Sequence, residues 1–497
     1  MVDGRRIRRA RAAAGGLAGR PGGQFGCLRP TGQRPWRRRL GRRRRGGVPR
    51  AGNHAGGDGR ERRSGVLTTL FLKALDERDQ VGRAKKVQPP IVVVVGHGAE
   101  AVKEKLQGKC KFVLQSEQLG TGHAVHQALS GLSPGGKTLV LYGDVPLIRF
   151  ASLQSMLDAT NDNALAVLTA TLDNPNGYGR IVRDDQQCVR SIVEQKDASV
   201  EQLAIQEINT GIMAMPTDRL SEWLPRLNSD NAQNEYYLTD IISMAAADGV
   251  AINTPSPSSM FEVQGVNDRC QLAELEREYQ FQQVRALMLA GATVADPARV
   301  DIRGNAVVGT DVFIDINVVL EGDVVIGDGV SIGAGSVLKN TTIGSGTQIH
   351  EHCVLENAEV AVDCQIGPFA RFRPGAQLQA SAKVGNFVEI KNSVLGVGAK
   401  ANHLAYIGDS DVGDGSNIGA GTITCNYDGA NKYRTVLGER VFVGSNSTLV
   451  APLKIESDAY VGAGSTITKN VDGEKLAIAR GKQRNIDGWK KPVKEKK

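Results

Sequence analysis

The sequence has few aromatic residues, no long apolar run and no closely paired cysteines. Its uninterrupted apolar runs reach five residues, as in Ile91–Val95, whereas a membrane-spanning helix needs about 20, so we expect no membrane span. Arg5–Arg11 is basic, but no apolar segment follows it, which argues against a secretory signal. The seven cysteines are scattered without a Cys-x-x-Cys pair. This argues against a disulfide framework and a cysteine zinc site, and it favours a reducing, cytoplasmic location.

Lysine is absent from the first 64 residues, which sets them apart from the rest of the chain. They contain 19 arginines and three acidic residues, a formal charge of +16, whereas the other 433 residues hold 42 basic and 50 acidic side chains, a charge of −8. The net charge of +8 therefore describes neither part. At 497 residues the chain is also long enough for two or more domains.

Residues 1–65 are rich in Arg, Gly, Ala and Pro and have few large apolar side chains. Such a segment cannot bury enough surface to offset the entropy of ordering. We expect it to be disordered, or to be a G+C-rich stretch read in the wrong frame or from a misplaced start. The alternative is a nucleic-acid-binding tail, with Arg37–Arg39 and Arg42–Arg45 as its densest clusters. Only Phe25 and Trp36 interleave with the arginines, so nucleic acid is not the expected partner.

Residues 66–266 alternate short apolar strands with helical patterns. Ile91–Val95 is typical of a buried strand, and the helical pattern of Ala101–Leu106 follows it. Phe112–Leu114 and Thr138–Leu141 are further short strands. This alternation predicts an α/β domain of Rossmann-like type with a mainly parallel sheet, whose ligands bind in loops at the strand ends.

Three polar clusters fall where such loops are expected. In Gln115–His123, glycines allow backbone N–H groups to approach a base or a phosphate. Asp144 directly follows a strand, where a carboxylate can hold Mg²⁺. The third cluster is Asn176–Arg180, with Glu194 and Asn209–Gly211 further along the chain. Taken alone, each cluster is a weak signal and fits an ordinary turn.

Residues 267–296 are predicted to form a linker helix and its connection. Apolar residues recur at helical spacing among charged and Gln-rich positions, at Leu272, Leu275, Tyr279 and Leu287. Asn267 or Asp268 can cap the start of this helix, and Asp296-Pro297 ends the connection.

Residues 297–480 repeat with a period of six. Apolar residues occupy Ile302, Val308, Ile314, Leu320, Ile326, Ile332 and Leu338, then Val360 to Ile390 after a phase slip, then Leu437 to Ile467. This period fits neither an α-helix nor a long alternating strand. It predicts a parallel β-helix with three short faces per coil and one inward residue per face. Residues 481–497 are a basic C-terminal tail.

Polar residues near the breaks in this repeat form the second candidate site. Arg373 and Lys391 are 18 residues apart, the length of one coil, and His403 and Tyr406 follow. A lone histidine in a repeat protein is more often structural. Here cations suited to a sugar phosphate accompany a side chain that can act as a base near pH 7, so His403 is the candidate catalytic residue. The polar loop Cys425–Thr435 also interrupts the coils.

Together the motifs resemble the bacterial bifunctional UDP-N-acetylglucosamine pyrophosphorylase / glucosamine-1-phosphate N-acetyltransferase family. They read GHGAE, LQSEQLGTGHA, LYGDVPL, NPNGYGRIV, IVEQKDA, QEINTGI, NEYYLTDII and VQGVNDR, with the acetyltransferase motifs around His403. The resemblance runs from about residue 91 to the C-terminus. It implies a left-handed β-helix, a homotrimer, and a cytoplasmic role in making precursors of peptidoglycan and lipopolysaccharide.

The resemblance implies acetyl transfer from acetyl-CoA to glucosamine 1-phosphate, with His403 as the base. It implies that Arg373 and Lys391 bind the phosphate, that Tyr406 and Asn417 position the sugar, and that Glu389 orients the site. The residues implied to contact acetyl-CoA or the oxyanion are Ala420, Asn426, Tyr427, Ser445, Ala463 and Arg480.

The resemblance also implies uridylyl transfer from UTP to N-acetylglucosamine 1-phosphate, with release of pyrophosphate. The residues implied to line this site are Gln115, Gly120, Thr121, Tyr142, Gly143, Asp144, Gly179, Glu194, Asn209 and Asn267. Asp144 and Asn267 are the implied ligands of Mg²⁺, which neutralises charge on the transferring phosphate.

One departure from the family affects this second activity. The family carries a loop of pattern LAAGxGTRMxSxxPK that cradles the triphosphate. It is expected near residues 50–65, where this sequence reads RAGNHAGGDGRERRSG, with no match in order and no Pro-Lys. We therefore expect uridylyl transfer to be absent or severely weakened. The alternative is an acetyltransferase whose nucleotidyltransferase-like domain is not catalytic.

Overall fold

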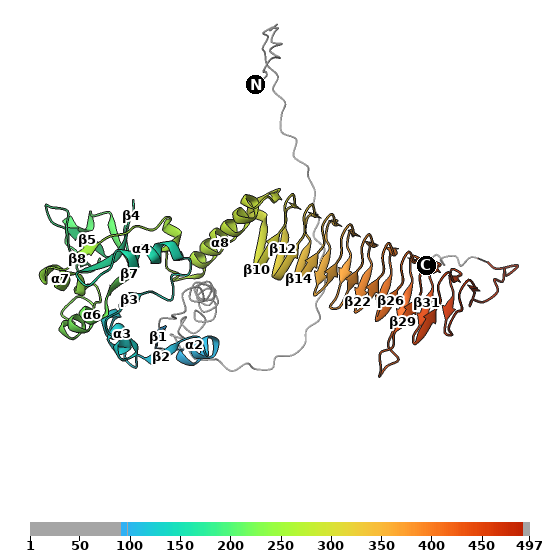
Figure 1. The fold of residues 1–497 in the computed structure, drawn as a ribbon, viewed down its shortest axis with the longest axis horizontal. Helices are drawn as coiled ribbons and strands as arrows, with labels where there is room; N and C mark the ends of the chain where they lie inside the picture. Colours follow the sequence, from blue (N-terminus) through green and yellow to red (C-terminus); the bar gives the residue numbers. More distant parts are fainter. Residues whose placement is uncertain (1–90, 97, 491–497) are drawn as a thin grey trace, which may run out of the picture. The chain divides into compact units, whose positions relative to one another are not determined.

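The computed structural model describes residues 91–96 and 98–490. The expectations for residues 1–65, for the start of the nucleotidyltransferase domain and for the last seven residues therefore lie outside the described residues. Along the described chain, an α/β part is followed by a long helix and then by a β-helix (Figure 1). Within these ranges, no helix is both long enough and apolar enough to cross a membrane.

The α/β part begins with two short parallel strands. They are β1 (Val92–Val95) and β2 (Lys111–Leu114), which form a separate two-stranded sheet and are connected by α2 (Ala99–Leu106). The β-branched run of β1 favours extended backbone. Helix α3 (Thr121–Ala128) follows β2 and begins at the predicted glycine-containing cluster.

Among the described residues, the main sheet of this part is mixed and most of its pairings are antiparallel, whereas the sequence predicted a mainly parallel sheet. Its strands are β6 (Val189–Val193), β5 (Arg180–Arg183), β7 (Glu207–Pro216), β4 (Ala164–Thr171) and β8 (Ala251–Asn253) in spatial order, and β3 (Lys137–Val140) also pairs with β7. Among the described strands of this sheet, only the β4–β8 pairing is parallel. The cause is β7, which follows the β5–β6 hairpin and the one-turn helix α5 (Val200–Leu203) and runs antiparallel to both β3 and β4.

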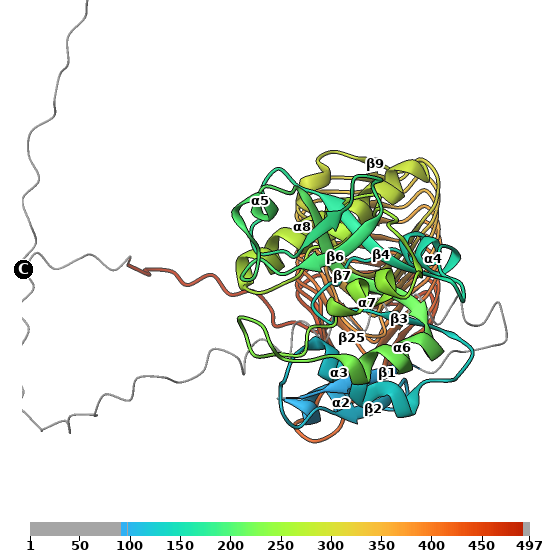
Figure 2. The same ribbon diagram turned by 90° about the vertical axis from the view of Figure 1, so that its left-hand side faces the viewer.

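Helices cover both faces of this sheet (Figure 2). Leu165, Val167 and Met213 pack with α6 (Thr217–Trp223) and α7 (Asp240–Ala247). Ala166 and Ile212 pack on the opposite face with α4 (Phe150–Asp158). Neighbouring strand residues point to opposite faces, so both faces of β4 and β7 are buried. Short 3₁₀ turns complete the described chain at Leu129–Gly131, Leu224–Arg226, Met260–Glu262 and Pro297–Arg299.

The linker helix α8 spans Arg269–Leu289 and is capped by Asp268, whose Oδ1 accepts from the backbone N–H groups of Cys270 and Gln271. Its buried positions are Leu275, Gln280, Val284 and Leu287. Gln280 is 2% exposed. Its amide donates to the Ile302 carbonyl at 3.0 Å and accepts from the Ile302 N–H at 2.6 Å. The helix thus pairs with, and covers, the edge of the first long strand of the β-helix.

The remaining strands stack in parallel as the coils of the left-handed β-helix (Figure 1). The first face holds β9 (Thr293–Val294), β11 (Phe313–Ile314), β13 (Ser331–Ile332), β15 (Gln348–Ile349), β18 (Gln365–Ile366), β21 (Lys383–Asn386), β24 (Lys400–His403), β27 (Asn417–Ile418), β30 (Phe442–Val443), β33 (Tyr460–Val461) and β35 (Leu476–Ala477). The second face holds β16 (Val354–Glu356), β19 (Arg371–Phe372), β22 (Glu389–Lys391), β25 (Tyr406–Gly408), β28 (Ile423–Cys425), β31 (Thr448–Val450) and β34 (Thr466–Ile467). The third holds β17 (Glu359–Val360), β20 (Gln377–Leu378), β23 (Val394–Leu395), β26 (Ser410–Val412), β29 (Thr435–Leu437) and β32 (Leu453–Ile455). The long strands β10 (Val300–Val308), β12 (Val318–Ile326) and β14 (Val337–Ile343) bend from the second face into the third.

The phase slips in the six-residue repeat have a structural cause. The inward residues Leu338 and Ile343, like Ile390 and Leu395, are five residues apart and buried in one continuous core. In each case the chain turns from the second face to the third through an asparagine at positive φ, Asn340 or Asn392. These tighter corners shorten the coil by one residue and shift the phase of the apolar pattern without interrupting the core.

Candidate active sites

The first candidate site begins at the N-terminus of α3. The Gln115 amide donates to the Gly120 carbonyl at 3.2 Å and lies 3.0 Å from the ring nitrogen Nδ1 of His123. The Thr121 hydroxyl accepts from the backbone N–H of Leu238 at 3.1 Å. The segment Gln115–Thr121 is therefore held by bonds within itself and to the chain before α7, and its polar groups are in fixed positions.

Tyr142 joins this segment to the acidic residues of the site. Thr121 bonds the Tyr142 hydroxyl, while burial and the neighbouring carboxylates of Glu194 and Asp144 raise the pKa of Tyr142 to about 12. The ring lies against Gly211, where φ is +83° and where any Cβ would clash with it. Only glycine satisfies both conditions, so Gly211 in the predicted cluster Asn209–Gly211 makes room for Tyr142.

The other predicted residues of this site are brought together as well. Glu194 lies against Gly179 and accepts from the Thr239 hydroxyl at 3.1 Å. The backbone N–H of Asn209 donates to the Gly179 carbonyl at 2.9 Å. Burial raises the pKa of Glu194. Gly143 is exposed beside Tyr142, with open space around its Cα.

Asp144 and Asn267 have the chemistry of a magnesium site. The Asp144 carbonyl accepts from the Val266 N–H at 2.9 Å, which brings the neighbouring Asn267 to the same place. Burial raises the pKa of the Asp144 carboxyl, and no basic side chain of the described residues forms an ion pair with it. A bound cation would stabilise the ionised form of this carboxyl, which burial disfavours. In the described ranges we find no cluster of three acidic, His or Cys ligands. Two protein oxygen donors nevertheless suffice for Mg²⁺, because this ion keeps several waters and also binds substrate phosphates.

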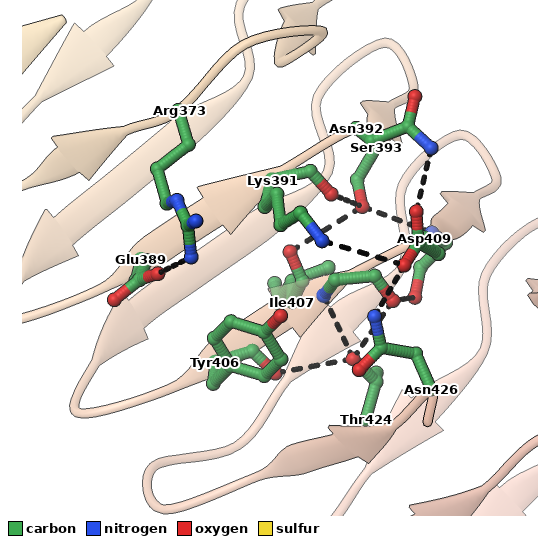
Figure 3. Close-up of polar contacts among 12 residues, drawn as sticks. Arg373, Glu389, Lys391, Asn392, Ser393, Tyr406, Ile407, Asp409, Thr424 and Asn426 are labelled. Carbon is green, nitrogen blue, oxygen red and sulfur yellow. Dashed lines mark hydrogen bonds and ion pairs between the residues drawn. The ribbon is translucent and has the colours of Figure 1, made fainter. Parts of the chain in front are cut away.

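The second candidate site lies on the second face of the β-helix (Figure 3). The Arg373 guanidinium donates to Glu389 at 3.1 Å, and Glu389 is in register with Tyr406 on the next coil. The Tyr406 hydroxyl lies so close to Gly408 that a Cβ there would clash with it. Lys391 is in register with Gly408, so the tyrosine side chain extends along the face toward the lysine.

Lys391 lies within a group of charges. Its Nζ is 3.9 Å from Oδ2 of Asp409. The neighbouring Lys432, burial and Arg373 lower the pKa of Lys391, while Asp409 opposes them. Lys432 comes from the polar loop Cys425–Thr435, so this loop adds a third cation to the two that the sequence predicts.

His403 lies at the corner between the first and second faces. Its Nδ1 is 2.7 Å from Oδ1 of Asn386, which is in register with it on the preceding coil. The backbone bonds Gly421 N–H to Leu404 carbonyl and Asn446 N–H to Ala420 carbonyl continue this corner from coil to coil. The candidate base therefore begins a column that runs towards the C-terminus.

That column contains most of the residues predicted to contact the coenzyme. Ala420, Ser445 and Ala463 occupy equivalent positions on successive coils. The Arg480 guanidinium donates to the Ala463 carbonyl at 2.7 Å and places a cation at the end of the column. Ser445, Ala463 and Arg480 are all exposed.

Two predicted residues lie at the other corner, where the polar loop leaves the coils. Asn426 is buried and its amide donates to Asp409. Tyr427 is exposed on the loop, and its hydroxyl donates to the Gly429 carbonyl. Asn417 also lies apart from His403, because it pairs with Lys400 at the start of β24, whereas His403 is at the end of that strand. Within one chain, Asn417 and His403 are not brought together.

Sequence reasoning missed three polar residues of this second site, namely Asn386, Asp409 and Lys432. Asn386 and Asp409 are each 17 residues from a partner in the site. That separation is the length of a shortened coil, so a search at coil spacing could have found them. Lys432 gives no such signal, because it lies on a loop that does not follow the repeat.

Comparison with known proteins finds family matches for both the α/β part and the β-helix of this chain. A family described as MobA-like NTP transferase domain matches residues 78–203, the GMPPB C-terminal domain matches residues 302–378, and the hexapeptide repeat of succinyl-transferase matches residues 434–469. The bifunctional protein GlmU of Stutzerimonas stutzeri is 58% identical over 417 residues, which cover 84% of this chain and 92% of that protein. The chain belongs to the GlmU family.

Other GlmU proteins are similar over the same extent. That of Pseudomonas putida F1 is 57% identical over 83% of this chain and 91% of its own length. That of Marinobacter nauticus is 53% identical over 86% of this chain and 93% of its own. This chain is therefore a transferase of the bifunctional GlmU type, with a nucleotidyltransferase part and a hexapeptide-repeat acyltransferase part.

Proposed function

We propose that the second face of the β-helix carries acetyl transfer from acetyl-CoA to glucosamine 1-phosphate. The observation that carries this proposal is that the candidate base and the cations lie at opposite sides of the same face. A histidine held by Asn386 occupies one corner, and the cations Arg373 and Lys391 gather toward the other. A phosphosugar amine needs both, a base for its nitrogen and cations for its phosphate.

The reaction follows from these groups. Arg373 and Lys391, joined by Lys432, bind the phosphate, while Tyr406 and Asn417 position the sugar. His403 accepts a proton from the 2-amino group of the sugar as the amine nitrogen attacks the thioester carbonyl. The carbon–sulfur bond then breaks, and coenzyme A leaves as the thiol after taking up a proton. Donors at Ser445, on the His403 corner, and at Asn426, which a neighbouring copy would bring from the other corner, stabilise the negative oxygen formed in between.

Acetyl-CoA fits the column that begins at His403. Small or short side chains at Ala420, Ser445 and Ala463 leave room for an extended molecule along the corner. Arg480 at the far end suits the coenzyme phosphates, and Tyr427 borders the site from the polar loop. This order places the thioester near the base and the charged end near the arginine.

The test of the acetyltransferase assignment is His403→Ala in a thiol-release assay with glucosamine 1-phosphate and acetyl-CoA. Loss of the base should lower the rate by about 10²–10⁴-fold. His352→Ala is the matched control, since His352 is also a β-helix corner residue, stacked on Phe369, but has no assigned role. Near-normal activity of His403→Ala would contradict the assignment of the base, and an inactive wild-type chain would contradict the function itself.

We also propose that the α/β part binds UTP and N-acetylglucosamine 1-phosphate for uridylyl transfer. Gln115, Gly120 and Thr121 contact the nucleotide. The remaining contacts to the sugar nucleotide come from Tyr142, Gly143, Gly179, Glu194 and Asn209. A sugar-phosphate oxygen attacks the α-phosphorus of UTP, and the bond to the β-phosphate breaks to release pyrophosphate. Mg²⁺ held by Asp144 and Asn267 would neutralise phosphate charge.

The segment at residues 50–65 limits this second activity. It has no match to the family's phosphate-cradling loop, so we propose that uridylyl transfer is absent or severely weakened in this chain. The alternative is an acetyltransferase whose nucleotidyltransferase-like part is not catalytic. The two proposals differ only in how much uridylyl transfer remains, and a pyrophosphate-release assay distinguishes them.

We further propose a cytoplasmic homotrimer that supplies precursors of peptidoglycan and lipopolysaccharide. A trimer would help to explain Asn417, because a neighbouring copy can bring it to a site that its own chain does not complete. The competing nucleic-acid-binding proposal rests on the +16 charge of residues 1–64. It predicts binding that disappears on deleting those residues, with acetyl transfer unchanged.

A further inference from the structure

A ladder of small polar residues follows the corner between the second and third faces of the β-helix. Its members are Asn340, Asn357, Asn392, Asp409 and Asn426, each two residues after an inward side chain. The first four have φ between 45° and 49°, a conformation in which Asn and Asp are common because their short side chains bond locally. Asp409 is the charged member of this ladder.

Asp409 receives a hydrogen bond from each of its neighbours in the ladder (Figure 3). The Asn392 amide donates to Oδ1 at 2.6 Å, and the Asn426 amide donates to Oδ2. Each partner is 17 residues away, one coil in either direction. An asparagine at this position would have one acceptor oxygen and could not accept both amides as they are oriented. The carboxylate therefore fixes the orientation of both.

The same carboxylate faces the cations of the acetyltransferase site. Lys391 Nζ lies 3.9 Å from Oδ2. Burial by itself raises the pKa of Asp409, but the two amides, Lys391 and Lys432 outweigh it and the pKa is lowered. For Lys391 the balance is reversed, since Lys432, burial and Arg373 all lower its pKa and Asp409 is the group that opposes them.

The fold itself does not require a charge at this corner. Asn340, Asn357 and Asn392 make the same turn with neutral side chains, and the Asn340 amide donates to Oδ1 of Asn357 at 3.3 Å. The carboxylate occurs at the coil where a lysine and a buried amide of the candidate site meet. Its position is thus explained by those two groups better than by the turn.

We propose that Asp409 is a positioning residue for acetyl transfer, holding the Lys391 ammonium and the Asn426 amide in one fixed arrangement. This inference rests on the proposed function, which assigns Lys391 to the phosphate and Asn426 to the acetyl-transfer side. Asp409 is 7% exposed and acts through these two neighbours. It couples the two halves of the substrate site across three coils.

The test is Asp409→Asn, which gives the ladder the residue that it has elsewhere. The KM for glucosamine 1-phosphate should rise by about 10- to 100-fold, the range for losing a charge-assisted bond. The KM for acetyl-CoA should rise less, because Asn426 alone is affected there. The alkaline pH at which the KM for the sugar phosphate begins to rise should move to lower pH, since Lys391 loses the group that favours its charged form.

Two further variants keep the result interpretable. Asp363→Asn is the matched control, because Asp363 is also at positive φ (57°) on the β-helix but is exposed; its kinetics should equal those of the wild type. Asp409→Glu keeps the charge, so its alkaline limb should stay near that of the wild type even if its KM rises. This comparison carries the test if Asp409→Asn does not fold, and an alkaline limb of Asp409→Glu displaced to lower pH would overturn the proposal.

The outcomes separate the proposal from the function beneath it. An inactive wild-type chain would remove the acetyltransferase assignment itself. An active wild type with Asp409→Asn within twofold in both KM values and in pH profile would overturn the positioning role alone. A loss confined to thermal stability, with unchanged kinetics, would likewise show that Asp409 serves only the turn.

Discussion

The imidazole Nδ1 of His403 lies 2.7 Å from Oδ1 of Asn386, one coil earlier in the β-helix. An acceptor at this distance favours the tautomer with hydrogen on Nδ1 and leaves Nε2 free to accept a proton. We therefore predict that Asn386→Leu lowers kcat for acetyl transfer by about 3- to 10-fold, the effect of one ordinary hydrogen bond. Both KM values should stay near normal, because Asn386 is not among the residues assigned to bind substrate.

The control for this prediction is Asn305→Leu. Asn305 donates to Asp323 at 3.1 Å, also between successive coils, near the start of the β-helix. It should leave kcat unchanged. An unchanged kcat in Asn386→Leu, or an equal loss in both variants, would show that the contact with His403 does not orient the base.

Arg183 and Glu207 make a pH-dependent contribution to the stability of the α/β part. The guanidinium of Arg183 donates to both carboxylate oxygens of Glu207, at 2.8 and 2.7 Å. These bonds lower the pKa of Glu207, against burial, which raises it. A lowered folded-state pKa stabilises the fold above the unfolded value, about 4.3, and that stability is lost as the pH falls through the folded value.

Glu207→Gln should accordingly be less stable at pH 7 by about 1–2 kcal/mol, allowing for partial exposure of the pair. The gap between the urea midpoints of variant and wild type should be constant from pH 7 to 5 and should close below pH 4. Glu222→Gln, which breaks an exposed pair with Arg219 at 3.2 Å, should show almost no gap. A Glu207→Gln gap that is the same at pH 3 and pH 7 would rule out the ionic origin.

The β-helix could be predicted from the sequence because each face contributes one inward residue at a fixed interval. Ile314, Leu320 and Ile326 fill the core in this way, and six-residue spacing has few other structural meanings. The shortened corners are harder to predict, because a five-residue step through Asn340 appears in the sequence only as a shift in the phase of the six-residue repeat. The direction of β7 could not be predicted, because an apolar strand has the same composition whether its neighbours run parallel or antiparallel.

The residues of the candidate sites could likewise be predicted only in part from the sequence. His403 stood out because a base and cations occurred together in the sequence. Asp409 did not, because Ile-Gly-Asp-Ser fits an ordinary turn, and its partners Asn392 and Asn426 are a full coil away on either side. Contacts between coils depend on coil length, which itself varies between corners.

Gln280 is predicted to stabilise the junction between α8 and the β-helix. Its buried amide satisfies both the N–H and the carbonyl of Ile302. Gln280→Leu would leave both backbone groups without these partners, at a cost of about 2–4 kcal/mol. Gln282→Leu on the same helix removes only a bond to Glu278 at 2.7 Å and should change stability by about 0.5 kcal/mol or less. Equal urea midpoints for the two variants would contradict the prediction.

The last prediction concerns the balance between the two activities. Phosphoryl-type transfer relies on positioning and charge neutralisation, so a displaced or missing phosphate loop costs about 10²-fold or more. We expect pyrophosphate release from UTP and N-acetylglucosamine 1-phosphate to be at least that much slower than in the GlmU of Stutzerimonas stutzeri, measured side by side. Thiol release by the acetyltransferase should be within a few-fold of that relative, because His403, Arg373 and Lys391 are all present. Deletion of residues 1–64 should leave both rates as they are if this segment contributes nothing to either site. Uridylyl transfer at the relative's rate in the full chain, lost on that deletion, would instead show that the arginine-rich segment cradles the triphosphate in a form that its sequence does not reveal.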